Sequence, residues 1–219
     1  MFKSKKLFYI ALIFFILSMG LNFPFPHKSP YGETILSILN IPIETVNGFQ
    51  FVGITSLVLL IASLIFLTRS LKKYRARAVL IAILISMFLP MMLVNLYQKN
   101  LATGIYAISY EREWSSCEFE MIDDVTLHGE CELPFENYRG NVNQFTVEFQ
   151  ERYYADDEVS MLSLMNQTAP YEVRLEGNEK KVVKINVDID VSNMENHVEN
   201  GSAKGINIII KSGDEIRKL

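Results

Sequence analysis

Few side chains in this chain of 219 residues have the types and spacing that chemistry needs, and the two cysteines come first. Neither Cys117 nor Cys131 has a second cysteine or a histidine at the spacing of a zinc site. A cysteine pair in a protein that reaches an oxidising compartment typically forms a disulfide. We therefore expect Cys117 and Cys131 to be bonded to each other.

The other candidate ligands and nucleophiles do not form a recognisable site. His27 lies beside Lys28, His128 alternates to the polar face beside Glu130, and His197 lies in a predicted loop beside Glu195 and Glu199, and each is expected to be a single exposed or interfacial histidine. The acidic groups Asp123-Asp124 and Asp156-Asp157-Glu158 lack the oxygen-ligand spacing of a calcium loop, and turns or solvated charge explain them. No glycine-rich phosphate loop, G-x-S-x-G or H-E-x-x-H motif occurs. The sequence thus predicts no catalytic, cofactor or metal site, and a protein that is not an enzyme.

The residues around the two cysteines predict a hairpin that brings the sulfurs together. Apolar and polar residues alternate on both sides of a turn centred on Asp124, as in half-buried strands. A three-residue loop there places Met121 opposite Leu127, Phe119 opposite Gly129 and Cys117 opposite Cys131. A non-hydrogen-bonded cross-strand pair has the spacing that a disulfide requires.

Further alternating segments extend this pattern over residues 104–219. Strands are expected around Tyr106–Tyr110, Phe145–Gln150, Tyr171–Leu175, Val183–Val191 and Ile206–Ile210, and Gly177-Asn178 signals a turn between the third and fourth of these. Seven short strands without a long amphipathic helix predict an extracytoplasmic β-sandwich, immunoglobulin-like, with a small β-barrel as the alternative. Trp114 precedes the first cysteine, so the Cys-Trp-Cys order of antibody domains is absent.

Residues 1–103 are predicted to be a membrane anchor. Three apolar stretches, about 7–23, 49–68 and 78–97, approach or reach the length of a transmembrane helix and contain no ionisable residue. Ionisable residues inside spans mark ion and proton pathways, so a transporter or channel acting alone is disfavoured. The first stretch could be a cleaved signal peptide, but Asn22-Phe23-Pro24 does not resemble a cleavage site, and an uncleaved anchor is favoured.

Charge predicts which way the anchor faces. Residues 104–219 hold 23 Asp and Glu against 11 Lys and Arg, whereas residues 1–103 hold 2 against 10. Positive charge beside a span marks the cytoplasmic side. The cations that determine topology are Lys3, Lys5, Lys6, Arg69, Lys72, Lys73, Arg75 and Arg77. They predict a multi-pass protein of a cell membrane with a cytoplasmic N-terminus and an extracytoplasmic C-terminal domain, and the Lys-, Ile- and Asn-rich usage is typical of bacteria.

The function predicted from this organisation is protein interaction or assembly in the cell envelope. The expected partners are the lipid bilayer and an envelope or membrane protein, with no nucleic acid and no cofactor. The predicted contact surface lies on the long loops Tyr153–Pro170 or Asn193–Gly205. Four apolar residues mark the first loop: Met161, Leu162, Leu164 and Met165. Their spacing equally suits a short helix that packs on the sandwich. The alternative function is that of an accessory or regulatory subunit of a larger membrane complex, such as a transporter or sensor.

Overall fold

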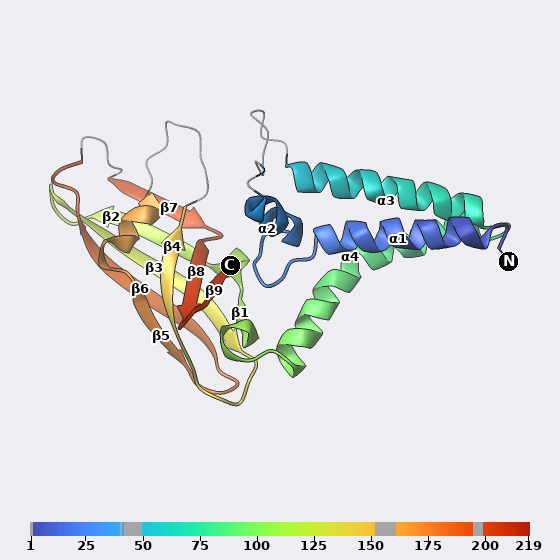
Figure 1. The fold of residues 1–219 in the computed structure, drawn as a ribbon. Helices are drawn as coiled ribbons and strands as arrows, with labels where there is room; N and C mark the ends of the chain where they lie inside the picture. The colour runs from blue at the N-terminus through green and yellow to red at the C-terminus, as the bar shows by residue number, and fades with distance from the viewer. Residues whose placement is uncertain (1, 40, 42–49, 152–160, 195–198) are drawn as a thin grey trace. The chain divides into compact units, whose positions relative to one another are not determined.

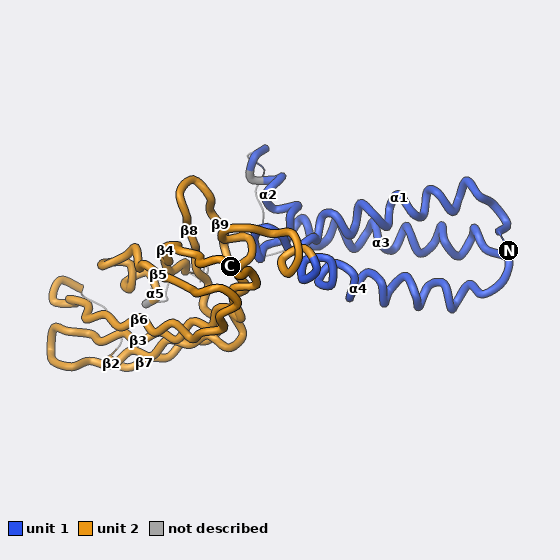
Figure 2. Tube along the Cα trace, turned by 90° about the horizontal axis from the view of Figure 1, so that it is seen from below, with its two compact units in different colours: residues 1–96 blue, residues 97–219 orange. Residues whose placement is uncertain are grey.

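The long apolar stretches of the sequence form helices, and the alternating segments form β-strands. The computed structural model describes residues 2–39, 41, 50–151, 161–194 and 199–219 (Figure 1). The chain divides into two compact units, Met1–Leu96 and Tyr97–Leu219, which are distinguished by colour in Figure 2. The division lies before the predicted domain boundary between residues 103 and 104.

Helices make up the first unit in the part of the chain that the structure describes. They are α1 (Lys5–Leu21), α2 (Tyr31–Ile38), α3 (Phe51–Ser70) and α4 (Arg75–Asn100), of which the last continues into the second unit. α3 and α4 are long and apolar enough to cross a membrane. α1 has 17 residues, which gives a helix about 26 Å long against a bilayer core of about 30 Å. Two of the three predicted spans are thus helices of sufficient length, and the first is a shorter apolar helix.

Hydroxyl groups join α1 to α3. Ser18 Oγ donates a hydrogen bond to the carbonyl of Ser56 at 2.8 Å, and Ser63 Oγ donates to the carbonyl of Ala11 at 2.8 Å. Small residues let apolar helices approach closely, and the hydroxyls add an attraction that lipid cannot replace. The hydroxyl of Ser86, by contrast, donates within its own helix, to the carbonyl of Ile83.

Two antiparallel sheets form most of the second unit (Figure 1). In the five-stranded sheet, β3 (Thr126–Asn137) pairs with β6 (Lys180–Asp190) on one side and with β1 (Ile108–Tyr110) and β2 (Ser116–Met121) on the other, and β7 (Asn200–Lys204) pairs with β2. The four-stranded sheet has the order β5 (Tyr171–Leu175), β4 (Asn143–Gln150), β8 (Asn207–Ser212) and β9 (Glu215–Lys218). Buried side chains of both sheets form one hydrophobic core.

The Gly177-Asn178 turn connects strands of different sheets. β5 belongs to the four-stranded sheet and β6 to the five-stranded one, so the turn carries the chain across the core. A Cβ at Gly177 would lie 2.1 Å from the carbonyl oxygen of Gly140, and therefore only glycine fits there. Asn178 has φ 57°, a left-handed conformation that asparagine tolerates.

Two strands occur where the sequence pattern did not predict them. β7 lies inside the predicted loop Asn193–Gly205, and β9 follows β8 through a turn at Gly213, which has φ +56°. β7 was missed because its buried-side positions are occupied by small residues, Gly201 and Ala203, rather than by large apolar ones. Part of this predicted loop, residues 195–198, lies outside the described residues.

A buried arginine joins β9 to the segment that precedes β1. The guanidinium of Arg217 donates to the carbonyls of Ile105 at 2.6 Å and Ile108 at 2.8 Å. Burial lowers the pKa of Arg217 to about 10, because desolvation disfavours its charged form. The two bonds satisfy carbonyls of a 3-10 turn, Gly104–Ala107, and of the strand that follows it.

Candidate functional site

The predicted hairpin is present with the predicted register and disulfide. Met121 pairs with Leu127, Phe119 with Gly129 and Cys117 with Cys131, and the two sulfurs are bonded.

The backbone pattern explains why this pair of cysteines can be bridged. The N–H of Ile122 donates to the carbonyl of Thr126, which makes these two residues a hydrogen-bonded pair next to the turn. Hydrogen-bonded and non-hydrogen-bonded pairs alternate along an antiparallel ladder, so Cys117 and Cys131 form a non-hydrogen-bonded pair. Their Cα atoms are 4.1 Å apart, in keeping with the closer spacing of such pairs.

Gly129 lies at the centre of this hairpin because there is no room for a side chain. A Cβ built there would lie 2.6 Å from Met165 Sδ and 3.1 Å from Phe119 Cε1. Phe119 is therefore packed over the glycine of the opposite strand, as the predicted register implied. Met165 covers the same position from the segment after residue 160.

The burial of this segment corrects the predicted contact surface. α5 (Met161–Leu164) is followed by a 3-10 turn, Met165–Thr168. Met165 is 0% exposed and Leu162 9% exposed, and Leu164 packs against the core. The alternative prediction, a short helix that packs on the core, holds for Leu162, Leu164 and Met165. Their apolar side chains pack in or against the core, and that of Met165 lies beside Gly129. The side chain of Met161 and residues 152–160 of the predicted loop, with Asp156-Asp157-Glu158, lie outside the described residues.

Exposed apolar side chains lie instead at the tip of the disulfide-bonded hairpin. Ile122 is 62% exposed and Val125 47% exposed, on either side of Asp123 and Asp124. β3 begins at Thr126, so Val125 belongs to the turn. Asp123 Oδ1 accepts a hydrogen bond from the Val125 N–H at 2.9 Å, which lowers the pKa of Asp123 and fixes the turn.

The histidines and acidic groups do not assemble into a metal centre among the described residues. His128 Nδ1 lies 2.6 Å from Asp188 Oδ1 in an exposed cross-strand pair of β3 and β6. Within the described ranges, no group of three or more His, Cys, Asp or Glu could hold a metal ion. His197 lies outside them.

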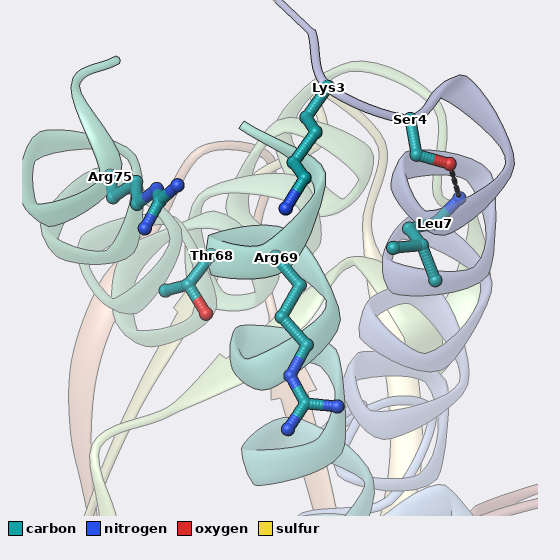
Figure 3. A pocket seen from close by; sticks show the side chains of 6 residues that line it. All are labelled: Lys3, Ser4, Leu7, Thr68, Arg69 and Arg75. Atoms are coloured by element: carbon teal, nitrogen blue, oxygen red, sulfur yellow. Dashed lines mark hydrogen bonds between the residues drawn. The ribbon is translucent and has the colours of Figure 1, made fainter. Parts of the chain in front are cut away.

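A basic pocket occupies the end of the first unit at which the chain begins. It has a volume of about 450 Å³ and is lined by Lys3, Ser4, Leu7, Thr68, Arg69 and Arg75 (Figure 3). The side chains of Lys3 and Arg75 extend toward the same space, with Thr68 below them (Figure 3). Three of the eight cations predicted to determine topology therefore share one pocket.

Backbone contacts create this pocket by joining the start of the chain to the end of α3. The N–H groups of Lys3 and Ser4 both donate to the carbonyl of Ser70, at 2.6 Å and 3.2 Å, and Phe2 forms a β-bridge with Leu71. Ser4 Oγ accepts from the Leu7 N–H and so caps α1. The Lys3 and Arg69 side chains are thereby brought to the same end of two antiparallel helices.

Charge in the pocket is not neutralised by carboxylates in the described part of the chain. Among the described residues, none of the salt bridges involves Lys3, Arg69 or Arg75. Arg75 Nε donates to the carbonyl of Leu71 at 2.9 Å, which holds the guanidinium in place. The other predicted topology residues, Lys5, Lys6, Lys72, Lys73 and Arg77, do not line the pocket.

The sequence identified the cations of the pocket, but it did not predict that they lie together. A serine directly before an apolar helix is a typical N-cap, so Ser4 could have been recognised. The return of the first residues to Ser70 and Leu71 depends on the pairing of α1 with α3, and no local pattern encodes it. Comparison with protein-family models, with curated proteins and with solved structures finds no match to this chain.

Proposed function

We propose that the chain is a multi-pass membrane protein that presents a non-catalytic, extracytoplasmic β-sandwich for protein interaction in the cell envelope. α1, α3 and α4 are its three spans, with α1 completed at the interface by the aromatic residues that follow it. The observation that carries the interaction role is the pair of exposed apolar side chains, Ile122 and Val125, at the tip of the hairpin.

The disulfide supports an extracytoplasmic site for the acidic domain. Disulfides persist in oxidising compartments and are rare in the cytoplasm. The basic ends of α1 and α3 are joined by backbone bonds to Ser70, so Lys3 and Arg69 belong on one side of a membrane. Cations concentrate on the cytoplasmic side of spans, which assigns that side to these residues.

Two antiparallel sheets around one core support the sandwich. In antibody domains the conserved disulfide connects the two sheets, whereas Cys117 and Cys131 lie on neighbouring strands of one sheet. The immunoglobulin-like assignment therefore rests on the antiparallel strands and their number.

The hairpin tip has the properties of a small, rigid contact site. The disulfide and the Asp123 bond to Val125 restrict the backbone, which lowers the entropy lost when a partner binds. A few fully desolvated residues contribute most of the affinity in protein interfaces. Ile122 and Val125 serve this purpose better than Leu162 and Met165, which are committed to the core.

Co-purification of cross-linked protein in mild detergent tests the proposal. Ile122→Asp with Val125→Asp should abolish recovery of the partner without lowering the melting temperature. The matched control is Val142→Asp with Val182→Asp, which changes two other exposed valines, 44% and 50% exposed. The control variant should retain the partner.

The same experiment distinguishes the accessory-subunit alternative. A chain cut to residues 1–103 should lose the partner if the domain makes the contact. Retention of the partner by the helices alone would contradict the interaction role of the domain and would favour a subunit of a larger membrane complex. Equal loss in both paired variants would contradict the assignment to the hairpin tip.

A further inference from the structure

We propose that the basic pocket at the joined ends of α1 and α3 binds the phosphate of an anionic phospholipid headgroup. The proposal uses the membrane position of these helices from the proposed function, but the pocket itself is defined by contacts within the first unit.

The first argument is the concentration of unneutralised positive charge. Among the described residues, Lys3, Arg69 and Arg75 line a space of about 450 Å³ and no carboxylate does. The side chains of Lys3 and Arg75 extend into this space, whereas the Arg69 guanidinium extends away from them along α3 (Figure 3). Lys3 and Arg75 repel each other, so an anion between them removes an unfavourable interaction as well as adding favourable ones. Basic pockets between helices at the cytoplasmic side of a membrane are suited to phosphate headgroups.

The second argument is that the donors match phosphate oxygens. The guanidinium of Arg75 uses Nε for the carbonyl of Leu71, and its two terminal nitrogens keep their donors for a ligand. Ser4 Oγ accepts a bond from Leu7 N–H, which leaves its hydroxyl hydrogen available to donate. Lysine acts as a point charge and arginine as a directional donor, and the combination is common around phosphate.

The third argument favours a lipid over a free anion. Leu7 supplies an apolar wall to the pocket. Along α1 and α3, many of the exposed side chains are hydrocarbon, including Ile10, Leu12, Ile13, Ile61 and Ile65. A phospholipid can place its phosphate among the cations and its acyl chains along these side chains. Inorganic phosphate would use only the charged part of this surface.

The fourth argument is that the pocket is organised before a ligand arrives. The Ser70 carbonyl accepts from two successive backbone N–H groups, of Lys3 and Ser4, and thereby fixes the start of the chain against α3. A site whose backbone is already ordered loses less entropy on binding.

Native mass spectrometry of the purified full chain in mild detergent tests the proposal. The probes are dioctanoyl-phosphatidylglycerol, dioctanoyl-phosphatidylcholine and inorganic phosphate. The pocket variant combines Lys3→Gln, Arg69→Gln and Arg75→Gln. The control variant combines Lys5→Gln, Lys6→Gln and Arg77→Gln, which removes the same charge from outside the pocket.

Wild-type protein should bind phosphatidylglycerol in preference to phosphatidylcholine. The pocket variant should lose at least about tenfold in affinity, and the control variant less than about threefold. Because Arg75 also bonds to the backbone, Lys3→Gln alone is a second test that should weaken binding without lowering the melting temperature.

Equal losses in the pocket and control variants would overturn the proposal, because a general field of charge would then explain the binding. Equal binding of phosphatidylcholine would overturn it as well. Phosphate that binds as tightly as phosphatidylglycerol, with the same dependence on Lys3, would assign the pocket to a free anion instead. Binding in detergent does not depend on which side of a membrane the pocket faces, so a failure of the proposed topology is detected separately by reporter fusions.

Discussion

Gly129 shows how a single position ties the hairpin to the rest of the core. Replacement by alanine would place Cβ 2.6 Å from Met165 Sδ and 3.1 Å from Phe119 Cε1. Overpacking of this kind destabilises a core by about 1–3 kcal/mol. We expect Gly129→Ala to lower the free energy of unfolding by that amount in denaturant titrations. In the control Gly140→Ala, the new Cβ would lie 3.8 Å from its nearest neighbour, and a comparable loss there would contradict this explanation.

Arg217 and Arg174 allow a buried and an exposed arginine to be compared in one domain. Arg217→Met removes the Arg217 donor from the carbonyls of Ile105 and Ile108, of which Ile108 keeps a bond from Gln98 Nε2 at 3.2 Å. An unsatisfied buried group costs about 1–3 kcal/mol. Arg174 forms an exposed pair with Glu176 at 3.0 Å, and such pairs contribute about 0–1 kcal/mol. Thermal unfolding should show a large loss for Arg217→Met and little change for Arg174→Met. Similar melting temperatures would mean that the Arg217 bonds do not stabilise the domain.

Asp123 gives the hairpin turn a dependence on acid pH. Its pKa is lowered from the ordinary 3.8, first by the backbone bond from Val125 and then by the side chain of Thr126. A carboxyl with a depressed folded pKa stabilises the fold above its unfolded pKa, and this contribution is lost as the pH falls through the folded pKa. An NMR titration should place Asp123 below 3.8, and Thr126→Val should raise its pKa. A Thr126→Val variant with an unchanged pKa would rule out the hydroxyl contribution.

At the scale of elements, the disulfide fixes the pairing of β2 with β3. Cys117 and Cys131 close a loop of about 15 residues, for which the chain-entropy model gives about 3 kcal/mol. The double variant Cys117→Ser and Cys131→Ser should unfold at lower denaturant by a corresponding free energy. Labelling native protein without reductant should detect no free thiol, and two reactive thiols would show that the bond does not form in cells.

Strands with large apolar residues on one face were predictable because the alternation is local. The hairpin register followed from the alternation on both sides of a three-residue loop centred on Asp124, since a side-chain period of two allows few alternatives. β7 could not be predicted in the same way, because Gly201 and Ala203 give no hydrophobic signal and its formation depends on pairing with β2. Alternation thus predicted the strands with large apolar residues, whereas the edge strand β7 could be recognised only from its pairing with β2.

The candidate sites were less predictable than the strands because exposure is a tertiary property. Met165 was predicted to be an apolar contact residue of a surface loop. It is buried because Gly129 leaves a space that its side chain fills. Ile122 follows β2 at a position of the same parity as the exposed Glu118 and Glu120, so it lies on the outward face, where an apolar side chain gives no alternation signal. Lys3 and Arg75 were identifiable as cations, but their shared pocket depends on hydrogen bonds to Ser70.

At the scale of the whole molecule, charge separates the two parts of the chain. The eight cations near the start of α1 and between α3 and α4 contrast with an acidic excess of 12 charges in residues 104–219. In the proposed topology the cations near the spans set the orientation, because long segments and acidic residues contribute little to it. A cytoplasmic position for the basic ends then requires an odd number of spans to place the disulfide-bonded domain outside. α1 is consequently the helix on which the topology depends.

We expect a C-terminal alkaline phosphatase fusion to be active and a C-terminal fluorescent fusion that folds only in the cytoplasm to be dark. Protease added to protoplasts should remove residues 104–219 and spare the segment Arg69–Arg77. Removal of charge provides the control. Replacing Lys3, Lys5 and Lys6 with Gln weakens the cytoplasmic signal of α1, and part of the protein population should then insert in the inverted orientation. An inactive phosphatase fusion with a fluorescent cytoplasmic reporter would contradict the proposed topology, and it would place the disulfide-bonded domain on the side where disulfides are rare.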